Sequence, residues 1–161
     1  MKKGRGLEIF KLVTSIILCQ GAGLIGSFFT RPAIPVWYAS LKKPIFTPPD
    51  WVFAPVWITL YFLMGVAGFL VWQKGLKHTQ VRIGLFFFSA QLVLNALWSY
   101  LFFGLRAPLA GFAEILVLCL AVLLTLQSFF RVSYIAGFLL IPYFLWVTLA
   151  VVLNLFIWLY N

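Results

Sequence analysis

Five long apolar stretches, separated by short polar or proline-rich segments, constrain most strongly how this chain can fold. They cover Leu12–Phe29, Trp51–Trp72, Ile83–Phe103, Leu109–Phe130 and Tyr134–Tyr160. A helix needs about 20 apolar residues to cross the hydrocarbon core of a bilayer, and each stretch is close to that length or longer. Because a helix satisfies its own backbone hydrogen bonds, as the bilayer interior requires, the pattern predicts an all-α membrane protein with a five-transmembrane-helix bundle.

The composition excludes an ordinary soluble domain. Hydrophobic residues make up 64% of the chain and charged residues only 9%, against about 25% charged residues in soluble proteins. No internal repeat is visible, which disfavours an inverted-repeat transporter, so we expect a single domain over residues 1–161. A long ordered loop, about Thr30–Asp50, would join helices 1 and 2. The expected helices cover about 8–29, 50–73, 82–104, 108–130 and 134–159.

The basic residues lie near the ends of the apolar stretches, so the formal charge of +9 indicates contact with a membrane surface and no nucleic acid. One side would carry Lys2, Lys3, Arg5, Lys11, Lys74, Lys77, Arg82 and Arg131, and the other Arg31, Lys42, Lys43 and Arg106. This bias predicts a cytoplasmic N-terminus in the plasma membrane of a prokaryote. An outer membrane or an organelle membrane, where the rule need not hold, stays open.

The first apolar stretch has one alternative interpretation, a cleaved signal peptide after the basic N-terminus. Glu8 and Lys11 interrupt the approach to that stretch, and no Ala-x-Ala cleavage site follows it. We therefore expect it to remain as the first helix.

Metal binding and conventional catalysis are not expected. Cys19 and Cys119 fall inside apolar stretches and His78 is the one histidine, so Cys and His cannot assemble a metal site. The chain has no paired-carboxylate site, Ser/His/Asp candidate, phosphate-binding loop or dinucleotide fingerprint. If the protein is an enzyme at all, the bound ligand has to supply the chemistry.

The segment from residue 37 to residue 61 predicts one wall of a ligand site. Pro44, Pro48 and Pro49 fix the backbone and prevent a helix from crossing them, and Asp50 can start the next helix. A preorganised loop thus leads into the aromatic start of a membrane helix. Its candidate ligand-binding residues are Trp37, Tyr38, Pro44, Phe46 and Trp51.

Five further aromatic residues lie a turn or more inside their helices, deeper than the interfacial belt where Trp and Tyr usually gather. They are Trp57, Tyr61, Trp98, Tyr143 and Trp146. They could line a pocket for a large planar ligand, or they could simply pack the bundle.

Several polar and small residues inside the helices leave two interpretations open. Gln91, Asn95 and Asn154 could bond between helices, which we favour, or contact a ligand. Glu114 could be a structural carboxylate or a ligand contact. The small residues of helix 1, Ala22 with Gly26 and Gly23 with Ser27, favour close packing within the bundle over a dimer interface.

Three sequence blocks together resemble a known family. Residues 37–57 read Trp-Tyr-x-x-Leu-x-Lys-Pro-x-Phe-x-Pro-Pro-x-Trp-Val-x-x-Pro-Val-Trp. Gln91-x-x-x-Asn95-x-x-Trp98 runs into Phe-Phe-Gly, and Pro142-Tyr143-x-x-Trp146 is followed by Leu153-Asn154-x-x-x-Trp158. This pattern closely resembles the TspO/MBR family of tryptophan-rich sensory proteins and translocator proteins, also called peripheral-type benzodiazepine receptors.

The resemblance implies non-covalent binding of a tetrapyrrole (porphyrin or haem-type) ligand, with a role as sensor, carrier or regulator, and a homodimer in the lipid bilayer. The alternative it carries is light- and oxygen-dependent porphyrin degradation, in which Trp57 and Trp146 would be the catalytic residues. A membrane scaffold or a lipid- or sterol-binding protein is the further alternative. Sterol binding is not expected, because the sterol motif has Tyr after Leu-Asn and Arg a few residues on, whereas here Leu155 and Phe156 follow Leu153-Asn154 and no basic residue occurs up to Asn161.

Overall fold

The computed structural model describes residues 2–161, with side chains described from Arg5 onward. Its long helices are α1 (Lys2–Ala33), α2 (Asp50–Trp72), α3 (Thr79–Ser99), α4 (Pro108–Val132) and α5 (Tyr134–Tyr160). All five are long and apolar enough to span a membrane, and the described residues contain no strand. The predicted five-helix bundle of a multi-pass integral membrane protein is therefore confirmed. The side chains of Lys2 and Lys3, which entered the charge count, lie outside the described part.

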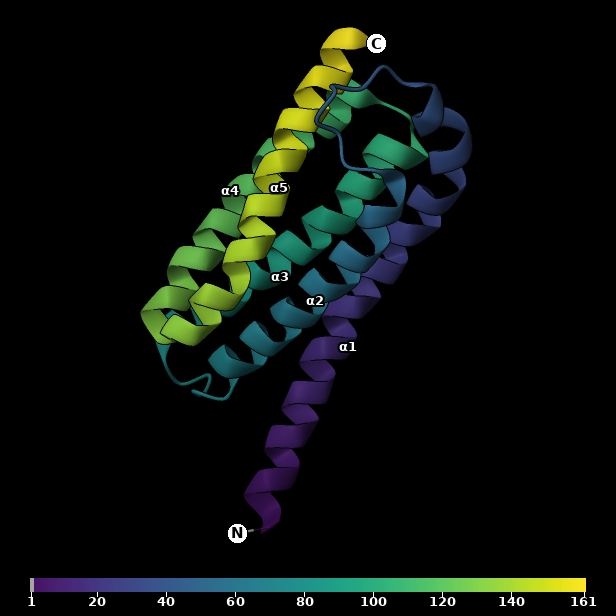
Figure 1. Ribbon diagram of the computed structural model, residues 1–161. Helices are drawn as coiled ribbons and strands as arrows, with labels where there is room; N and C mark the ends of the chain where they lie inside the picture. The colour runs from purple at the N-terminus through teal and green to yellow at the C-terminus, as the bar shows by residue number, and fades with distance from the viewer. Residues whose placement is uncertain (1) are drawn as a thin grey trace.

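The helices form a ring in the order α1, α2, α5, α4, α3, each packed against the next and α3 returning to α1. The N- and C-termini lie at opposite ends of the bundle (Figure 1), as an odd number of membrane crossings requires. The N-terminal part of α1 extends beyond the other helices. This order leaves α4 as the helix opposite the α1–α2 pair.

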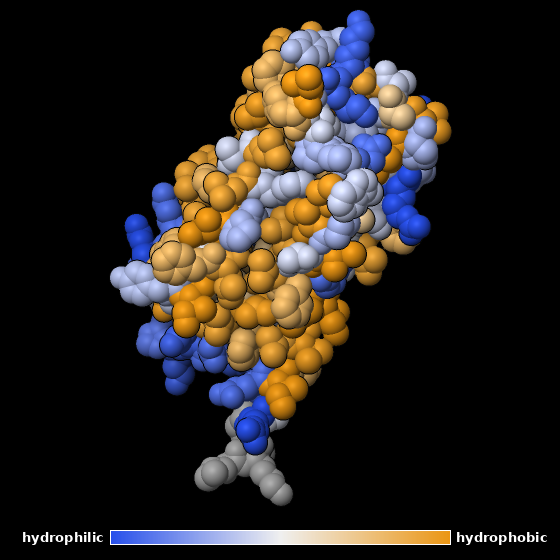
Figure 2. All heavy atoms as spheres, in the orientation of Figure 1, coloured by the Kyte–Doolittle hydropathy of each residue, from blue (hydrophilic) through white to orange (hydrophobic). Residues whose placement is uncertain are grey.

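The surface fits a bilayer environment. In Figure 2 apolar residues cover the middle of the visible face, and hydrophilic residues gather toward its two ends. Large side chains such as Phe28 and Phe86, which are 77% and 68% exposed, face outward from the bundle. Hydrocarbon chains can cover these side chains at no cost, whereas water could not.

Helix α1 extends further than expected into the segment assigned to the first loop. It runs through Ala33 and continues as the π-helical turn η1 (Ile34–Tyr38), so the non-helical connection is residues 41–49. Pro32 and Pro35 each remove one backbone donor, which normally ends an α-helix. The wider π turn absorbs this local mismatch and keeps the chain helical.

A second π-helical turn, η2 (Tyr100–Gly104), ends α3. The backbone N–H of Leu105 donates to the carbonyl of Tyr100 at 2.8 Å, five residues back. The two π turns meet, because Trp37 of η1 packs edge-on against Phe102 and Phe103 of η2 at centroid distances of 5.3 and 6.3 Å. They form an aromatic cluster at the end of the bundle where α1 finishes.

Small residues bring α1 close to its neighbours inside the bundle. A Cβ atom at Gly65 of α2 would lie 2.7 Å from the Cα of Ile16, and one at Gly26 would lie 2.8 Å from Oγ of Ser99. Real Cβ atoms do not approach backbone atoms that closely, so Gly65 requires glycine, whereas a side chain at Gly26 would force the Ser99 hydroxyl to move aside. For Gly26, these contacts agree with the interpretation favoured from the sequence, in which the small residues of α1 pack within one bundle.

Candidate functional site

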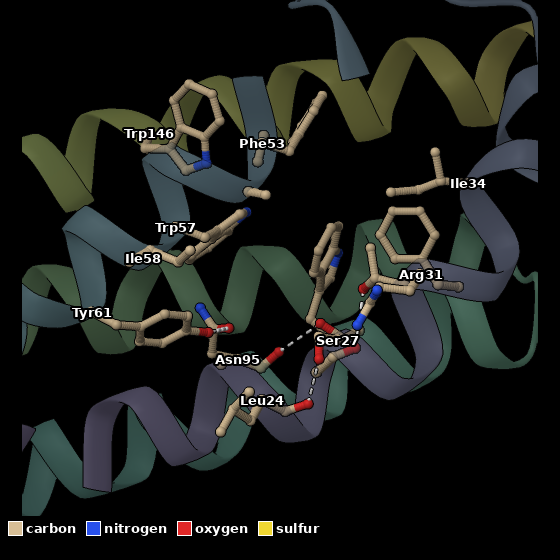
Figure 3. Close-up of a pocket in the computed structure, with 18 of the residues that line it drawn as sticks. Leu24, Ser27, Arg31, Ile34, Phe53, Trp57, Ile58, Tyr61, Asn95 and Trp146 are labelled. Carbon is tan, nitrogen blue, oxygen red and sulfur yellow. Dashed lines mark hydrogen bonds between the residues drawn. The ribbon is translucent and has the colours of Figure 1, made fainter. Parts of the chain in front are cut away.

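A cavity of about 480 Å³ lies between α1, α2, α3 and α5, with η1 at one end. Figure 3 shows it as a space bordered by side chains from each of these helices. Helix α4 contributes nothing to its wall. The lining residues are Gln20, Gly23, Leu24, Gly26, Ser27, Thr30, Arg31, Ile34, Tyr38, Asp50, Phe53, Ala54, Trp57, Ile58, Tyr61, Asn95, Trp98, Ser99, Phe103, Trp146, Leu149, Ala150 and Leu153.

Aromatic rings from α2 and α5 form one wall. Trp57 stacks on Tyr61 one turn later, with ring centroids 5.4 Å apart and planes inclined by 29°. Trp146 of α5 meets Phe53 of α2 edge-on at 5.8 Å. Spacing of four residues places Phe53, Trp57 and Tyr61 along one face of α2. This wall therefore offers both ring faces and ring edges to a ligand.

A chain of buried hydrogen bonds starts at this wall and runs into the core. The hydroxyl of Tyr61 donates to Oδ1 of Asn95, and Nδ2 of Asn95 donates to the hydroxyl oxygen of Tyr143 at 3.0 Å. Tyr143 in turn donates to Oε1 of Gln91 at 2.7 Å, and Gln91 donates to the carbonyl of Phe88. The chain links α2, α3 and α5 and holds the tyrosines and the asparagine in place behind the cavity.

Trp98 is held on the α3 side by two interactions. Its ring stacks on Phe102 at 5.3 Å with planes only 13° apart. Its indole Nε1–H donates to Oδ1 of Asn154 at 3.3 Å, and Nδ2 of Asn154 donates to the carbonyl of Ala150. The indole is thus oriented before any ligand arrives.

Half of the predicted ligand-binding residues line the cavity. These are Tyr38, Trp57, Tyr61, Asn95, Trp98 and Trp146. The interhelical role favoured for Gln91, Asn95 and Asn154 fits their hydrogen bonds, and Asn95 also borders the cavity.

The other predicted residues lie around the cavity and outside its lining. Tyr143 and Asn154 stand behind it, as partners of Asn95 and Trp98. Trp37 belongs to the aromatic cluster of the π turns, and Phe46 packs edge-on against Phe156 of α5. Pro44 is buried within the first connection. Trp51 is 76% exposed on α2, as a residue in an interfacial belt would be.

The wall contributed by α1 was missed by the sequence analysis. A Cβ atom at Gly23 would lie 2.5 Å from the ring of Tyr61, so glycine is needed where α1 closes over that ring. The spacing of Gly23 and Ser27 was visible in the sequence, but such spacing predicts close helix packing and not the hollow beside it. Two charged lining residues, Arg31 and Asp50, were also missed.

Glu114 lies apart from the cavity. It is buried in α4 with 8% of its surface exposed, and neither carboxylate oxygen has a hydrogen-bond partner. Within the described part of the chain, no group of three His, Cys, Asp or Glu side chains stands close enough to hold a metal ion. The cavity thus offers aromatic faces, a few oriented polar groups and two charges.

Comparison with known proteins gives a family match over most of the chain. Residues 15–159 match the TspO/MBR family. The chain is 45% identical to tryptophan-rich protein TspO of Archaeoglobus fulgidus over 155 residues, covering 96% of this chain and 99% of that protein. It is 43% identical to tryptophan-rich protein TspO of Chlorobaculum tepidum, covering 91% and 93%. It is 37% identical to the human translocator protein, covering 83% and 80%.

Proposed function

The chain belongs to the TspO/MBR family, and we propose that it binds a tetrapyrrole, of porphyrin or haem type, in the cavity between α1, α2, α3 and α5. The observation that carries the proposal is the gathering of Trp57, Trp98 and Trp146 around one apolar space of about 480 Å³. Sites for small molecules typically enclose about 300–1,000 Å³. A flat conjugated ring stacks favourably on indole faces. The ligand would be held without a covalent bond.

In this proposal the protein acts as a sensor, carrier or regulator of the tetrapyrrole within the membrane. Leu24 of α1 and Ile58 of α2 both line the cavity and are exposed on the surface of the bundle, which suits a ligand that partitions into bilayers. We further propose a prokaryotic plasma membrane, a cytoplasmic N-terminus and a homodimer. The archaeal and bacterial relatives support the prokaryotic membrane, and the translocator name of the human relative is compatible with a carrier.

A second candidate function is light- and oxygen-dependent porphyrin degradation. One observation favours it, because Trp57 and Trp146 both border the cavity. Each indole would lie beside a bound porphyrin and could donate an electron to its photoexcited ring. This activity needs no catalytic triad and no metal, since the absorbing ligand drives the reaction.

Titration of the purified protein with protoporphyrin IX, followed by absorbance in the dark and then under light, tests both candidates. We expect saturable binding that is stable in the dark.

Filling the cavity with Ala150→Trp should weaken binding by about tenfold or more, because Ala150 lines it. The matched control Ala113→Trp adds the same bulk on the exposed side of α4 and should bind normally. Absence of saturable binding would leave the scaffold or lipid-binding alternative, and a light-driven loss of the porphyrin spectrum would support degradation.

A further inference from the structure

The cavity has two chemically different ends. Helices α1 and α2 run antiparallel, and Gly23 meets Tyr61 at one end of the shared wall. Arg31 follows eight residues later on α1, and Asp50 precedes Tyr61 by 11 residues on α2, which the rise of about 1.5 Å per residue carries to the opposite end. Arg31 and Asp50 are the two charged residues among those that line the cavity, and both are exposed. We call this exposed, charged end the mouth of the cavity.

The deep end carries no charged side chain. Tyr61 donates to Asn95, and the amide of Asn95 donates onward to Tyr143. An ionised group on a ligand would lose its hydration there and find no charged partner, which is costly in a membrane interior. Any charge on the ligand must therefore stay at the mouth.

At the mouth, Arg31 is available for a ligand. Among residues 5–161 it forms no ion pair and no side-chain hydrogen bond, and Asp50 forms none either. Lys43, which is near this end, is already engaged, because its Nζ donates to the carbonyl of Tyr38 at 3.1 Å and lies 4.2 Å from the ring centroid of Tyr38. The planar guanidinium of Arg31 presents donors in a fork that matches a carboxylate.

We propose that Arg31 binds a carboxylate side chain of the ligand and so selects planar amphipathic acids over their neutral counterparts. The inference rests on the proposed tetrapyrrole function and adds the chemical class and orientation of the ligand. The acidic edge of the ring lies at the mouth beside Arg31, and the apolar body lies inward between the indoles of α2, α3 and α5. Asp50 repels additional carboxylates at the same mouth and limits how many acidic groups the site accepts.

A competing explanation is that Arg31 only extends to the lipid headgroups, as basic residues near helix ends often do. Its position in the last turn of α1 also suits a cation, which interacts favourably with the helix dipole. Neither role depends on whether the bound ligand carries a carboxylate. The two explanations therefore separate when an acidic and a neutral ligand of the same shape are compared.

The experiment compares protoporphyrin IX with its dimethyl ester, which has the same ring without ionised carboxylates. Binding is measured in the dark in nanodiscs of zwitterionic lipid. We expect the wild type to bind the diacid about tenfold or more tightly than the ester, as a charge-assisted hydrogen bond predicts. Arg31→Ala should remove most of this preference by weakening the diacid alone, and Arg31→Lys should retain part of it. Asp50→Asn should tighten the diacid several-fold.

Lys42→Ala is the matched control. Lys42 is an exposed cation in the first connection, and its side chain does not line the cavity. Its replacement should leave both affinities unchanged. If the wild type and Arg31→Ala bind diacid and ester alike, or if Arg31→Ala weakens both equally, the carboxylate assignment is wrong while tetrapyrrole binding stands. If neither porphyrin binds the wild type, the proposed function itself fails, and the inference fails with it.

Discussion

At the scale of single residues, Asn95 connects the cavity to the bundle core. Its amide oxygen accepts a hydrogen bond from Tyr61 of α2, and its amide nitrogen donates to Tyr143 of α5. Because no water competes inside a bilayer, the Tyr61 hydroxyl depends on Asn95 for its partner, whereas the Tyr143 hydroxyl also has Gln91. The polar group that looks best placed to contact a ligand is thus largely committed to holding three helices together.

The indoles of α2 and α5 carry a prediction that separates binding from photochemistry. Phenylalanine retains stacking area but is much harder to oxidise, so Trp57→Phe and Trp146→Phe should each cost about tenfold or less in porphyrin affinity. If indoles donate electrons, the same changes should abolish light-driven porphyrin loss. Binding and photobleaching, measured on the same samples, check this. Trp72→Phe is the control, because Trp72 lies beside Lys11 away from the cavity.

Parallel loss of binding and photochemistry in Trp146→Phe would make that residue a pocket wall and remove the main support for an enzyme. Unchanged photochemistry in both variants would also exclude these indoles as electron donors.

The residues show what a sequence can predict about such a site. Trp57, Trp98 and Trp146 were predicted because they lie a turn or more inside their helices, deeper than the interfacial belt where Trp usually gathers. Arg31 and the α1 wall were not, because a basic residue at a helix end and a small-residue stripe have ordinary explanations. Tyr143 was a candidate for the cavity wall but faces Asn95 behind the cavity. Its orientation depends on how α5 is rotated against α3. Periodicity along one chain does not determine that rotation.

At the scale of elements, the π turns and the first connection border the charged end of the cavity. Tyr38 of η1 and Asp50 of α2 line it, so both ends of the connection border the site. The backbone N–H of Lys42 donates to the side-chain oxygen of Asn161, and the side-chain amide of Asn161 donates to the backbone carbonyl of Lys42, each bond being 3.0 Å long. The five helices were predictable from hydropathy, whereas the π turns depend on contacts between segments far apart in the chain, such as Trp37 with Phe102.

The prolines of this connection should slow ligand release. Pro48 and Pro49 restrict its backbone, so less entropy is lost when it orders over a ligand. Replacing both with alanine should accelerate porphyrin dissociation while changing association little, which stopped-flow mixing measures. Pro108→Ala is the control, because Pro108 starts α4 and lies outside both the connection and the cavity lining. An unchanged off-rate in the double variant would mean that these prolines only terminate helices.

At the scale of the whole molecule, the basic residues follow the architecture. The connection between α2 and α3, with Lys74 and Lys77, and the turn after Arg131 between α4 and α5 lie toward the same end of the bundle (Figure 1). The connection between α1 and α2 lies toward the other end. This arrangement is what the positive-inside prediction assumes, although it does not by itself say which end faces the cytoplasm.

Labelling with a membrane-impermeant thiol reagent tests the orientation. Gly6→Cys and Ser40→Cys place single thiols at exposed positions near opposite ends of α1, and a Cβ atom at Gly6 has no neighbour within 4 Å. In intact cells we expect Ser40→Cys to label and Gly6→Cys to label only after the cells are opened. The parent protein is the control for Cys19 and Cys119. The reverse pattern would place the N-terminus outside.

The hydrogen bonds between Lys42 and Asn161 also bear on how the protein is made, because they join residues 119 positions apart. A ribosome adds about 5–20 residues per second, so roughly 6–24 seconds pass between synthesis of the two partners. Until α5 emerges and inserts, the cavity lacks the side of its wall that carries Trp146 and Ala150. A nascent chain with four helices in the membrane therefore has no complete cavity, and under the proposed function only the finished fold would capture a tetrapyrrole.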